Sequence, residues 1–204
     1  MSVAASVQPG EIVGSADQRV VLHGVPWAHF EAILALRGDE PAPRMTYLKG
    51  ELELMAPSRP HEGIKSLLGR MVELYALETG TPLSSFGSWT LKHPPAEIAI
   101  EPDECYILGN PRGKDRPDLA IEVIWTSGGL SKLEIYRGLR VPEVWQWREG
   151  AIRVFWLEGD DYGEVTGSRL FPNLALTLLA RLAAREDHGE AILEFRDAIR
   201  SLTG

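Results

Sequence analysis

The sequence predicts a domain of mixed α and β structure, in the α+β class. In some segments apolar residues recur at the spacing of an amphipathic helix, and in others they alternate with polar residues as in a half-buried strand. The two kinds of segment are interspersed along 204 residues, of which 44% are hydrophobic, enough for a buried core. We expect an N-terminal arm over residues 1–25, where no periodicity is sustained, and a single domain over residues 26–204.

The first half of the chain predicts two helices and a hairpin. Residues 27–36 have apolar positions near helical spacing, followed by a glycine that stops the helix. In residues 45–55, apolar and polar residues alternate on both sides of Lys49-Gly50, which is typical of a hairpin because glycine tolerates the positive φ of a tight turn. Residues 64–75 then carry the apolar stripe of a long amphipathic helix.

The second half predicts strands, a short helix and terminal helices. Three strand-like segments are separated by residues rich in proline, glycine and asparagine, and a second hairpin surrounds Glu149-Gly150. In order, the predicted elements are the strands LSSFGSWTLKH, IAIEPDECYIL and RPDLAIEVIWT, a helix at Ser131–Leu139, the hairpin strands VPEVWQW and AIRVFWLE, a strand at Gly163–Arg169, and helices from Leu174 onward.

Composition excludes several classes of protein. The net charge of −8, from 21 basic and 29 acidic residues, argues against a global basic field for nucleic acid or anionic membrane. The single cysteine, Cys105, excludes a disulfide framework within the chain and any multi-cysteine metal site, so that a metal must be held by oxygen or imidazole. We expect a cytoplasmic protein without membrane association, because no apolar run approaches the ~18 residues of a membrane span.

Two acidic residues in the predicted strands are candidates for chemistry. In the strand after Pro117, alternation puts Leu119 and Ile121 on one side and Glu122 on the other. An unpaired carboxylate in mid-strand would cost several kcal/mol, roughly, so Glu122 needs a metal ion or a buried base as a partner. Asp103 in the preceding strand is the natural second acid, because Mg²⁺ prefers carboxylate oxygens and relieves the repulsion between two acids. The alternative is that Glu122 pairs with an arginine and Asp103 caps a turn.

Lys132 favours the metal-site hypothesis. It begins the third predicted helix and shares a helical stripe with Ile135 and Tyr136, so its stem is expected to point toward the sheet. An ammonium beside two carboxylates can orient an attacking water and offset the charge that develops on a phosphate. The alternative is a surface lysine whose head reaches solvent.

These segments resemble the Uma family of restriction-endonuclease-like proteins. The resemblance covers about residues 45–180, through the blocks GELELMAPSRPHEGIKSLLGRMVEL, EPDECYIL, RPDLAIEVIWTS, IYRGLRVPEVWQW and FPNLAL in that order. It implies the core of PD-(D/E)XK nucleases, in which a central mixed sheet is flanked by helices, with Mg²⁺ or Mn²⁺ as cofactor and DNA as substrate.

Residue by residue, the resemblance assigns Asp103 and Glu122 as metal ligands and, with Lys132, as catalytic residues. The superfamily pattern has lysine two residues after the glutamate, where this sequence has Ile124. The Uma-like proteins resemble one another in having that lysine on the next helix, and Lys132 stands in that place here.

Three further residues are candidates for the same site. His61 and Glu62 begin the long helix after PSRP, where Glu62 could reach the site as an additional acid. The alternative is that Ser58 caps this helix and Glu62 complements the helix dipole. Asp118 lies earlier on the same strand face as Glu122 and could also contribute. The tryptophans of the second hairpin alternate as core residues do, so we expect Trp145, Trp147 and Trp156 to pack inside and not to stack on bases.

Two functions of different classes follow. The first is a metal-dependent endonuclease that hydrolyses phosphodiester bonds in DNA; a homodimer, the commonest soluble oligomer, would offer two sites to a duplex. The second is a catalytically unused nuclease fold that binds nucleic acid or protein, since a fold does not fix a function. Affinity for Mg²⁺ or Mn²⁺ discriminates between them, because only the enzyme needs it.

Overall fold

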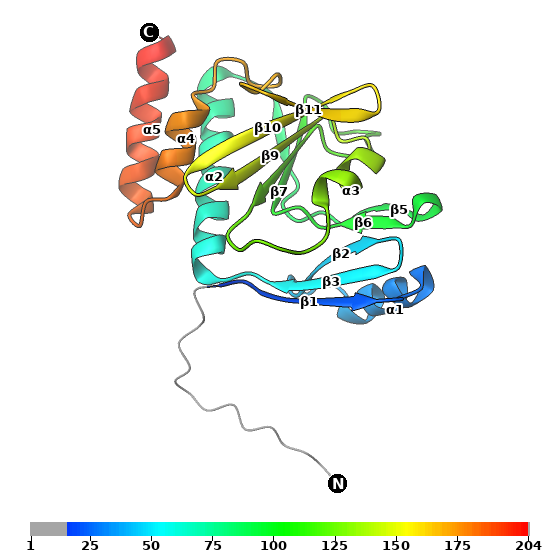
Figure 1. Ribbon diagram of the computed structural model, residues 1–204. Helices are drawn as coiled ribbons and strands as arrows, with labels where there is room; N and C mark the ends of the chain where they lie inside the picture. Colours follow the sequence, from blue (N-terminus) through cyan, green and yellow to red (C-terminus); the bar gives the residue numbers. More distant parts are fainter. Residues whose placement is uncertain (1–15, 204) are drawn as a thin grey trace, which may run out of the picture.

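Two β-sheets form the centre of the protein in the computed structural model, which describes residues 16–203 (Figure 1). Sheet A is antiparallel and sheet B is mixed, since β8 and β9 run parallel; this arrangement agrees with the predicted α+β class. In spatial order, sheet A contains β1 (Gln18–His23), β3 (Glu51–Ala56), β2 (Arg44–Leu48), β6 (Ile98–Ile100) and β5 (Leu91–His93), and sheet B contains β11 (Asp161–Val165), β10 (Ala151–Glu158), β9 (Glu143–Arg148), β8 (Leu119–Val123), β7 (Glu104–Leu108) and β4 (Leu83–Ser85).

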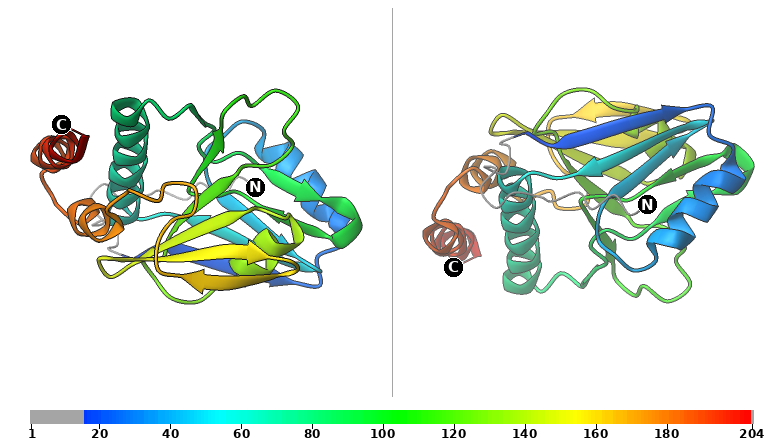
Figure 2. Two further views of the ribbon diagram at one scale, coloured as in Figure 1. Left: turned by 90° about the horizontal axis from the view of Figure 1, so that it is seen from above. Right: turned by 90° about the horizontal axis from the view of Figure 1, so that it is seen from below.

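Helices cover the outer faces of both sheets, and one helix lies between them (Figures 1 and 2). Helices α2 and α4 pack on one face of sheet B and α5 packs against these two helices, while α3 packs on the other face of sheet B and also contacts sheet A. Helix α1 covers the remaining face of sheet A. Their bounds are α1 (Trp27–Arg37), α2 (Arg59–Thr79), α3 (Lys132–Gly138), α4 (Leu176–Ala183) and α5 (His188–Thr203), with a short 3-10 turn at Pro94–Ala96.

Local sequence signals account for both hairpins and for α2. The two turn residues have positive φ in each hairpin: 46° and 95° at Lys49-Gly50, and 51° and 80° at Glu149-Gly150. Such turns match the right-handed twist of the flanking strands. Helix α2 begins after Ser58, whose side chain accepts a hydrogen bond from the His61 amide at 3.4 Å, as expected for an N-cap.

Two segments that we expected to be single strands are each divided between the sheets. Residues 83–93 contribute β4 to sheet B and β5 to sheet A, and residues 98–108 contribute β6 to sheet A and β7 to sheet B. The chain turns at Gly87, which has a φ of 53°, and at Pro102, which has no amide hydrogen to donate to a ladder. The prediction of continuous strands is therefore wrong at these two places.

The predicted N-terminal arm is also wrong in part. Residues 1–15 lie outside the described part of the chain, but residues 18–23 form β1, which pairs antiparallel with β3. The strand lies at the edge of sheet A and buries little of its side-chain surface, so it carries no apolar alternation that the sequence could reveal. The strand predicted at Gly163–Arg169 corresponds to β11, which begins two residues earlier and ends four residues earlier than predicted.

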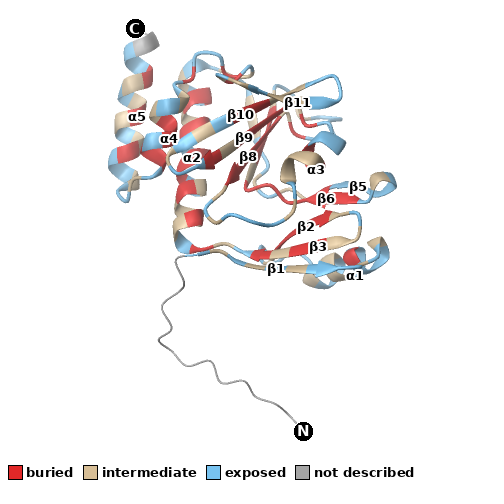
Figure 3. Cartoon of the chain, in the orientation of Figure 1, coloured by how far each residue is buried: buried red, intermediate tan, exposed pale blue. Residues whose placement is uncertain are grey.

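The cores lie on both faces of sheet B (Figure 3). Trp145 and Trp147 are 0% and 2% exposed, which confirms their prediction as core residues. Trp156 is half-buried, with the Arg169 guanidinium 5.1 Å from its ring centre. Among the described helices, none is both long and apolar enough to cross a membrane.

Candidate active site

Two buried carboxylates lie where β7 and β8 pair. The antiparallel register pairs Glu104 with Ile121, so that the next pair along the ladder is Asp103 and Glu122. Asp103 is 1% exposed and Glu122 is 0% exposed. Asp103 Oδ2 accepts a hydrogen bond of 2.7 Å from the amide of Val123, which fixes its carboxylate beside the neighbouring strand. We refer to Asp103 and Glu122 as the carboxylate pair.

Helix α3 supplies both partners of Glu122. Lys132 Nζ lies 2.5 Å from Glu122 Oε2, and the hydroxyl of Tyr136 donates to Oε1. The two residues are four apart, so one helix face presents both toward sheet B. Burial, followed by the nearby Glu122 carboxylate, raises the pKa of Tyr136 well above its usual value, so its hydroxyl keeps the proton that it donates. Lys132 is only 11% exposed, and its stem points inward as the sequence predicted.

Asp103 has different partners, from β2 and from the start of α2. Its Oδ1 is ion-paired with Arg44 Nη1 and lies 3.0 Å from His61 Nε2. Arg44 is 6% exposed at its side chain, and its other terminal nitrogen donates to Glu62 Oε1 at 2.6 Å. An arginine therefore does meet the carboxylate pair, but at Asp103 and not at Glu122.

His61 lies between two carboxylates. Its Nδ1 is 3.0 Å from Asp17 Oδ2, and Asp17 also accepts hydrogen bonds from the Ser58 amide at 2.9 Å and the Thr126 hydroxyl at 3.1 Å. Burial alone would raise the pKa of Asp17, but the hydrogen bonds from Ser58 and His61 hold it below its usual value. Burial lowers the pKa of His61, despite the opposing effect of Asp17. The imidazole therefore bridges two carboxylates, with Nδ1 toward Asp17 and Nε2 toward Asp103.

The donor atoms of this cluster fit a divalent cation that keeps water and substrate oxygens as ligands. Asp103 Oδ2 and both Glu122 oxygens each accept one hydrogen bond and retain a lone pair. His61 Nε2 is buried without a hydrogen bond among the described residues. Within residues 16–203, no group of three or more His, Cys, Asp or Glu side chains could enclose an ion alone. Mg²⁺ is usually held by one or two carboxylates together with water and substrate phosphate, and Asp103 and Glu122 would supply the carboxylates.

The structure separates the remaining sequence candidates. Glu62 lies in the first turn of α2 and reaches the cluster through Arg44, while its other oxygen is 3.4 Å from Lys65 Nζ. Asp118 is not brought to the site. It lies at the opposite end of β8 from Glu122, about 13 Å away at ~3.3 Å per residue, and its Oδ2 accepts from Lys114 Nζ at 2.5 Å and from the Leu108 amide at 2.8 Å.

The loop from Ile124 to Ser131, which joins Glu122 to Lys132, is fixed against sheet A. Arg19 donates to the carbonyl of Gly128 at 2.8 Å, and the amide of Leu130 donates to Glu53 Oε2 at 3.0 Å. Gly129 has a φ of 91°, and a Cβ there would collide with the Glu53 carboxylate. These contacts hold the loop that leads into α3, and therefore the position of Lys132 at the start of that helix.

Sequence analysis missed Arg44, Asp17 and Tyr136. A buried Asp103 needs a cation just as Glu122 does, and this need is the signal that points to Arg44. Tyr136 is named in the prediction only as a member of the helical stripe of Lys132, and its hydroxyl, four residues after Lys132 on the same helix face, is the signal that points to Glu122. Asp17 fell in the segment that we expected to be an arm.

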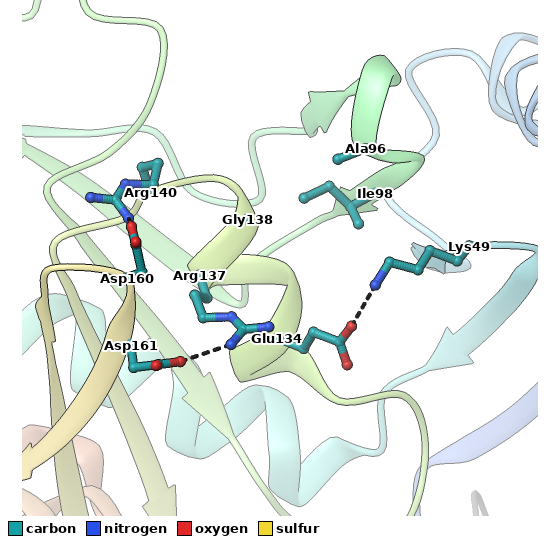
Figure 4. A pocket seen from close by; sticks show the side chains of 9 residues that line it. All are labelled: Lys49, Ala96, Ile98, Glu134, Arg137, Gly138, Arg140, Asp160 and Asp161. Atoms are coloured by element: carbon teal, nitrogen blue, oxygen red, sulfur yellow. Dashed lines mark hydrogen bonds and ion pairs between the residues drawn. The ribbon is translucent and has the colours of Figure 1, made fainter.

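Two hollows in the surface flank α3 and α2. The smaller, about 360 Å³, lies beside α3 and is lined mostly by charged residues of α3, of β11 and of the turns next to them (Figure 4). Its cations are paired within the hollow: Lys49 with Glu134 at 2.9 Å, Arg137 with Asp161 at 2.7 Å, and Arg140 with Asp160 at 2.9 Å. Neither member of the carboxylate pair lines it. The larger hollow, about 1220 Å³, lies at the first turns of α2 and includes Glu62.

Comparison with known proteins identifies the fold class and then the family. A crystal structure of a "putative nuclease belonging to DUF820" from Anabaena variabilis ATCC 29413 is similar to this one, with a TM-score of 0.52 and 13% identity over 79% of this chain and 99% of that chain. This likeness defines a nuclease-like fold. Residues 27–184 match the Uma2 family, described as "Putative restriction endonuclease", and the chain belongs to that family. No curated protein matches the sequence significantly.

Proposed function

We propose that this protein is a metal-dependent endonuclease that hydrolyses phosphodiester bonds in DNA, with Mg²⁺ or Mn²⁺ held by Asp103 and Glu122. One observation carries the proposal: two buried carboxylates, Glu122 in β8 and Asp103 just before the neighbouring β7, come together with a lysine ammonium 2.5 Å from Glu122. A buried ion pair is often no more stabilising than apolar residues of similar size, so stability alone is a weak reason for this arrangement. Membership of the Uma2 family supports a nuclease.

Each side chain of the cluster has a distinct role in this proposal. Asp103 and Glu122 supply the oxygen ligands, and a bound Mg²⁺ would lower the pKa of a water and neutralise phosphate charge. Lys132 keeps a positive charge beside the pair, which stabilises the negative charge that develops on the phosphate. Tyr136 holds Glu122 in place, and its raised pKa keeps it a donor.

Arg44 connects the buried pair to the surface. Its guanidinium contacts both Asp103 and Glu62, and the Glu62 side chain is 42% exposed. A cation that joins Asp103 competes with Arg44 for the same carboxylate, but Arg44 keeps Glu62 as a partner when it gives up Asp103. In this exchange Asp103 becomes available to the cation, and Arg44 stays ion-paired with Glu62.

A catalytically unused module for binding nucleic acid or protein is the second candidate. The observation in its favour is that Arg44 and Lys132 already balance the two negative charges of the pair. A protein with such internal counter-ions has no electrostatic need for a metal ion. The net charge of −8 also disfavours binding to DNA without one.

Cleavage of nucleic acid tests the proposal against this alternative. Supercoiled plasmid and single-stranded DNA are incubated with the protein in Mg²⁺, in Mn²⁺ and in EDTA. If the protein is the proposed nuclease, it cleaves only when metal is present, and Asp103→Asn and Glu122→Gln abolish cleavage. Asp118→Asn is the matched control, because this carboxylate directly precedes the strand of Glu122 and lies outside the cluster. Absence of metal-dependent cleavage of either substrate, or equal activity in Asp103→Asn, would contradict the proposal.

A further inference from the structure

A carboxylate from outside the matched part of the chain is buried beside the candidate site. Asp17 directly precedes β1, whereas the match to the Uma2 family begins at residue 27. Strand β1 starts close to the first turn of α2 (Figure 1), and the Asp17 side chain is 1% exposed there. A buried carboxylate is costly unless hydrogen bonds satisfy it, so the partners of Asp17 indicate what its burial achieves.

The partners of Asp17 come from two segments that lead to the site. Its Oδ1 accepts a hydrogen bond from the Ser58 amide at 2.9 Å, at the start of α2. Its Oδ2 is shared between His61 Nδ1 at 3.0 Å and the Thr126 hydroxyl at 3.1 Å. Thr126 belongs to the loop between β8 and α3, so these contacts join that loop to α2. The contacts with Ser58 and Thr126 stabilise the fold whatever the function is.

The contact with His61 differs from the other two because it continues to the carboxylate pair. The His61 side chain is 1% exposed, and its Nε2 lies 3.0 Å from Asp103 Oδ1. An imidazole held at Nδ1 can no longer turn freely, so Asp17 also fixes the direction in which Nε2 points. The other oxygen of Asp103 accepts the 2.7 Å hydrogen bond from the Val123 amide. Both oxygens of this proposed metal ligand therefore have a partner that sets their position.

His61 gains importance when a cation replaces Arg44. Asp103 Oδ1 is also ion-paired with Arg44, and in the proposed function the cation competes with this arginine. Once Arg44 has turned to Glu62, His61 is the side chain that still faces Oδ1 among the contacts described above. A ring that Asp17 holds in place then keeps the Asp103 carboxylate from rotating away from the cation.

We propose that Asp17 is a positioning residue of the metal site: it holds the His61 ring, which in turn holds the Asp103 carboxylate in the orientation that a divalent cation needs. The inference rests on the proposed metal-dependent function and adds to the site a residue from the segment before β1. Residues that orient metal ligands from outside are often needed for full metal affinity. Asp17 is therefore expected to change the affinity for metal without touching the ion.

The affinity for Mn²⁺, measured by electron paramagnetic resonance on variants whose folding is checked by circular dichroism, tests the inference. Asp17→Asn keeps the size of the side chain and removes its charge. It is expected to weaken Mn²⁺ binding by about 10-fold, at the lower end of the range for loss of an outer partner of a metal ligand. Thr126→Val is the matched control, because it removes a hydroxyl bonded to the same oxygen of Asp17 and leaves His61 in place. This control is expected to lower stability in urea and to keep the affinity for Mn²⁺.

A second variant, His61→Gln, interrupts the same contact from the other side. The glutamine amide can still reach Asp103, but it has no Nδ1 with which to contact Asp17. We expect His61→Gln to lose about as much Mn²⁺ affinity as Asp17→Asn does. The double variant should lose nothing further, because two residues that act through one contact are not additive. His61→Gln also tests the inference if Asp17→Asn does not fold.

The outcomes separate this inference from the proposed function. Binding of Mn²⁺ as tight as in the wild type, in Asp17→Asn or in His61→Gln, overturns the positioning role and leaves the metal site intact. Losses that add in the double variant show that Asp17 acts by another route, and an equal loss in Thr126→Val shows that any loosening of this region is enough; each also overturns the inference. A folded wild-type protein that binds no Mn²⁺ overturns both the inference and the metal site.

Discussion

Replacement of Lys132 by methionine isolates the ion pair on which the candidate site depends. Methionine keeps an unbranched apolar stem beside Ile135 and Tyr136 but removes the ammonium that lies 2.5 Å from Glu122. Glu122 is 0% exposed, so the carboxylate left behind cannot turn to water. Only the Tyr136 hydroxyl then remains among the side-chain donors that we observe on it.

The expected loss follows from this burial. Removing one partner of a buried ion pair typically costs about 3–5 kcal/mol, and the remaining hydrogen bond from Tyr136 places the expected value near the lower end, about 3 kcal/mol. In Glu122→Gln the lysine is left at 11% exposure, where its flexible stem can carry the ammonium toward water, so a smaller loss is expected. The double variant should be more stable than Lys132→Met alone, because no buried charge is left unpaired.

Urea denaturation followed by circular dichroism measures these free energies of unfolding. An unchanged dependence on urea concentration would show that only stability has changed. A loss below about 1 kcal/mol for Lys132→Met, as for a surface ion pair, would refute the reasoning. So would a double variant that is no more stable than Lys132→Met.

Three further predictions concern chemistry, the 124–131 loop and the cysteine. Lys132→Met is expected to lower the rate of cleavage by about 10²–10⁴ while Mn²⁺ affinity is kept; equal loss of both would give Lys132 an architectural role. Gly129→Ala should lower the free energy of unfolding by about 1–3 kcal/mol more than Gly128→Ala, measured in urea, since both have positive φ but only the first collides with Glu53. Burial raises the pKa of Cys105 to about 12, so iodoacetamide should label it at pH 8 only after denaturation, as mass spectrometry would detect; rapid labelling of the native protein would contradict this.

The parts of the fold that the sequence predicts are those set by local chemistry. The turns at Lys49-Gly50 and Glu149-Gly150 depend on residues next to each other, and the N-cap at Ser58 depends on an amide three residues away. The division of residues 98–108 between two sheets depends instead on which distant strands offer hydrogen bonds. Nothing in that segment except Pro102 distinguishes one long strand from two short ones.

The same distinction applies to the site. Glu122 and Lys132 are ten residues apart, so strand alternation and one helix stripe were enough to relate them. The ion pair between Arg44 and Asp103 joins the two sheets, and His61 meets Asp17 across 44 positions of sequence. Such contacts arise from the packing of whole elements, and a single sequence carries no periodicity that reports it.

Binding of Mn²⁺ tests the central claim most directly, because it does not depend on which nucleic acid is the substrate. Free and bound Mn²⁺ are distinguished by electron paramagnetic resonance during titration of the protein. The account predicts saturable binding to the wild-type protein and to Asp118→Asn, and loss of that binding in Asp103→Asn and Glu122→Gln. Folding of the two variants is checked by circular dichroism. A folded wild-type protein that binds no Mn²⁺, or an Asp103→Asn variant that binds it as tightly as the wild type, would contradict the assignment of this carboxylate pair as a metal site.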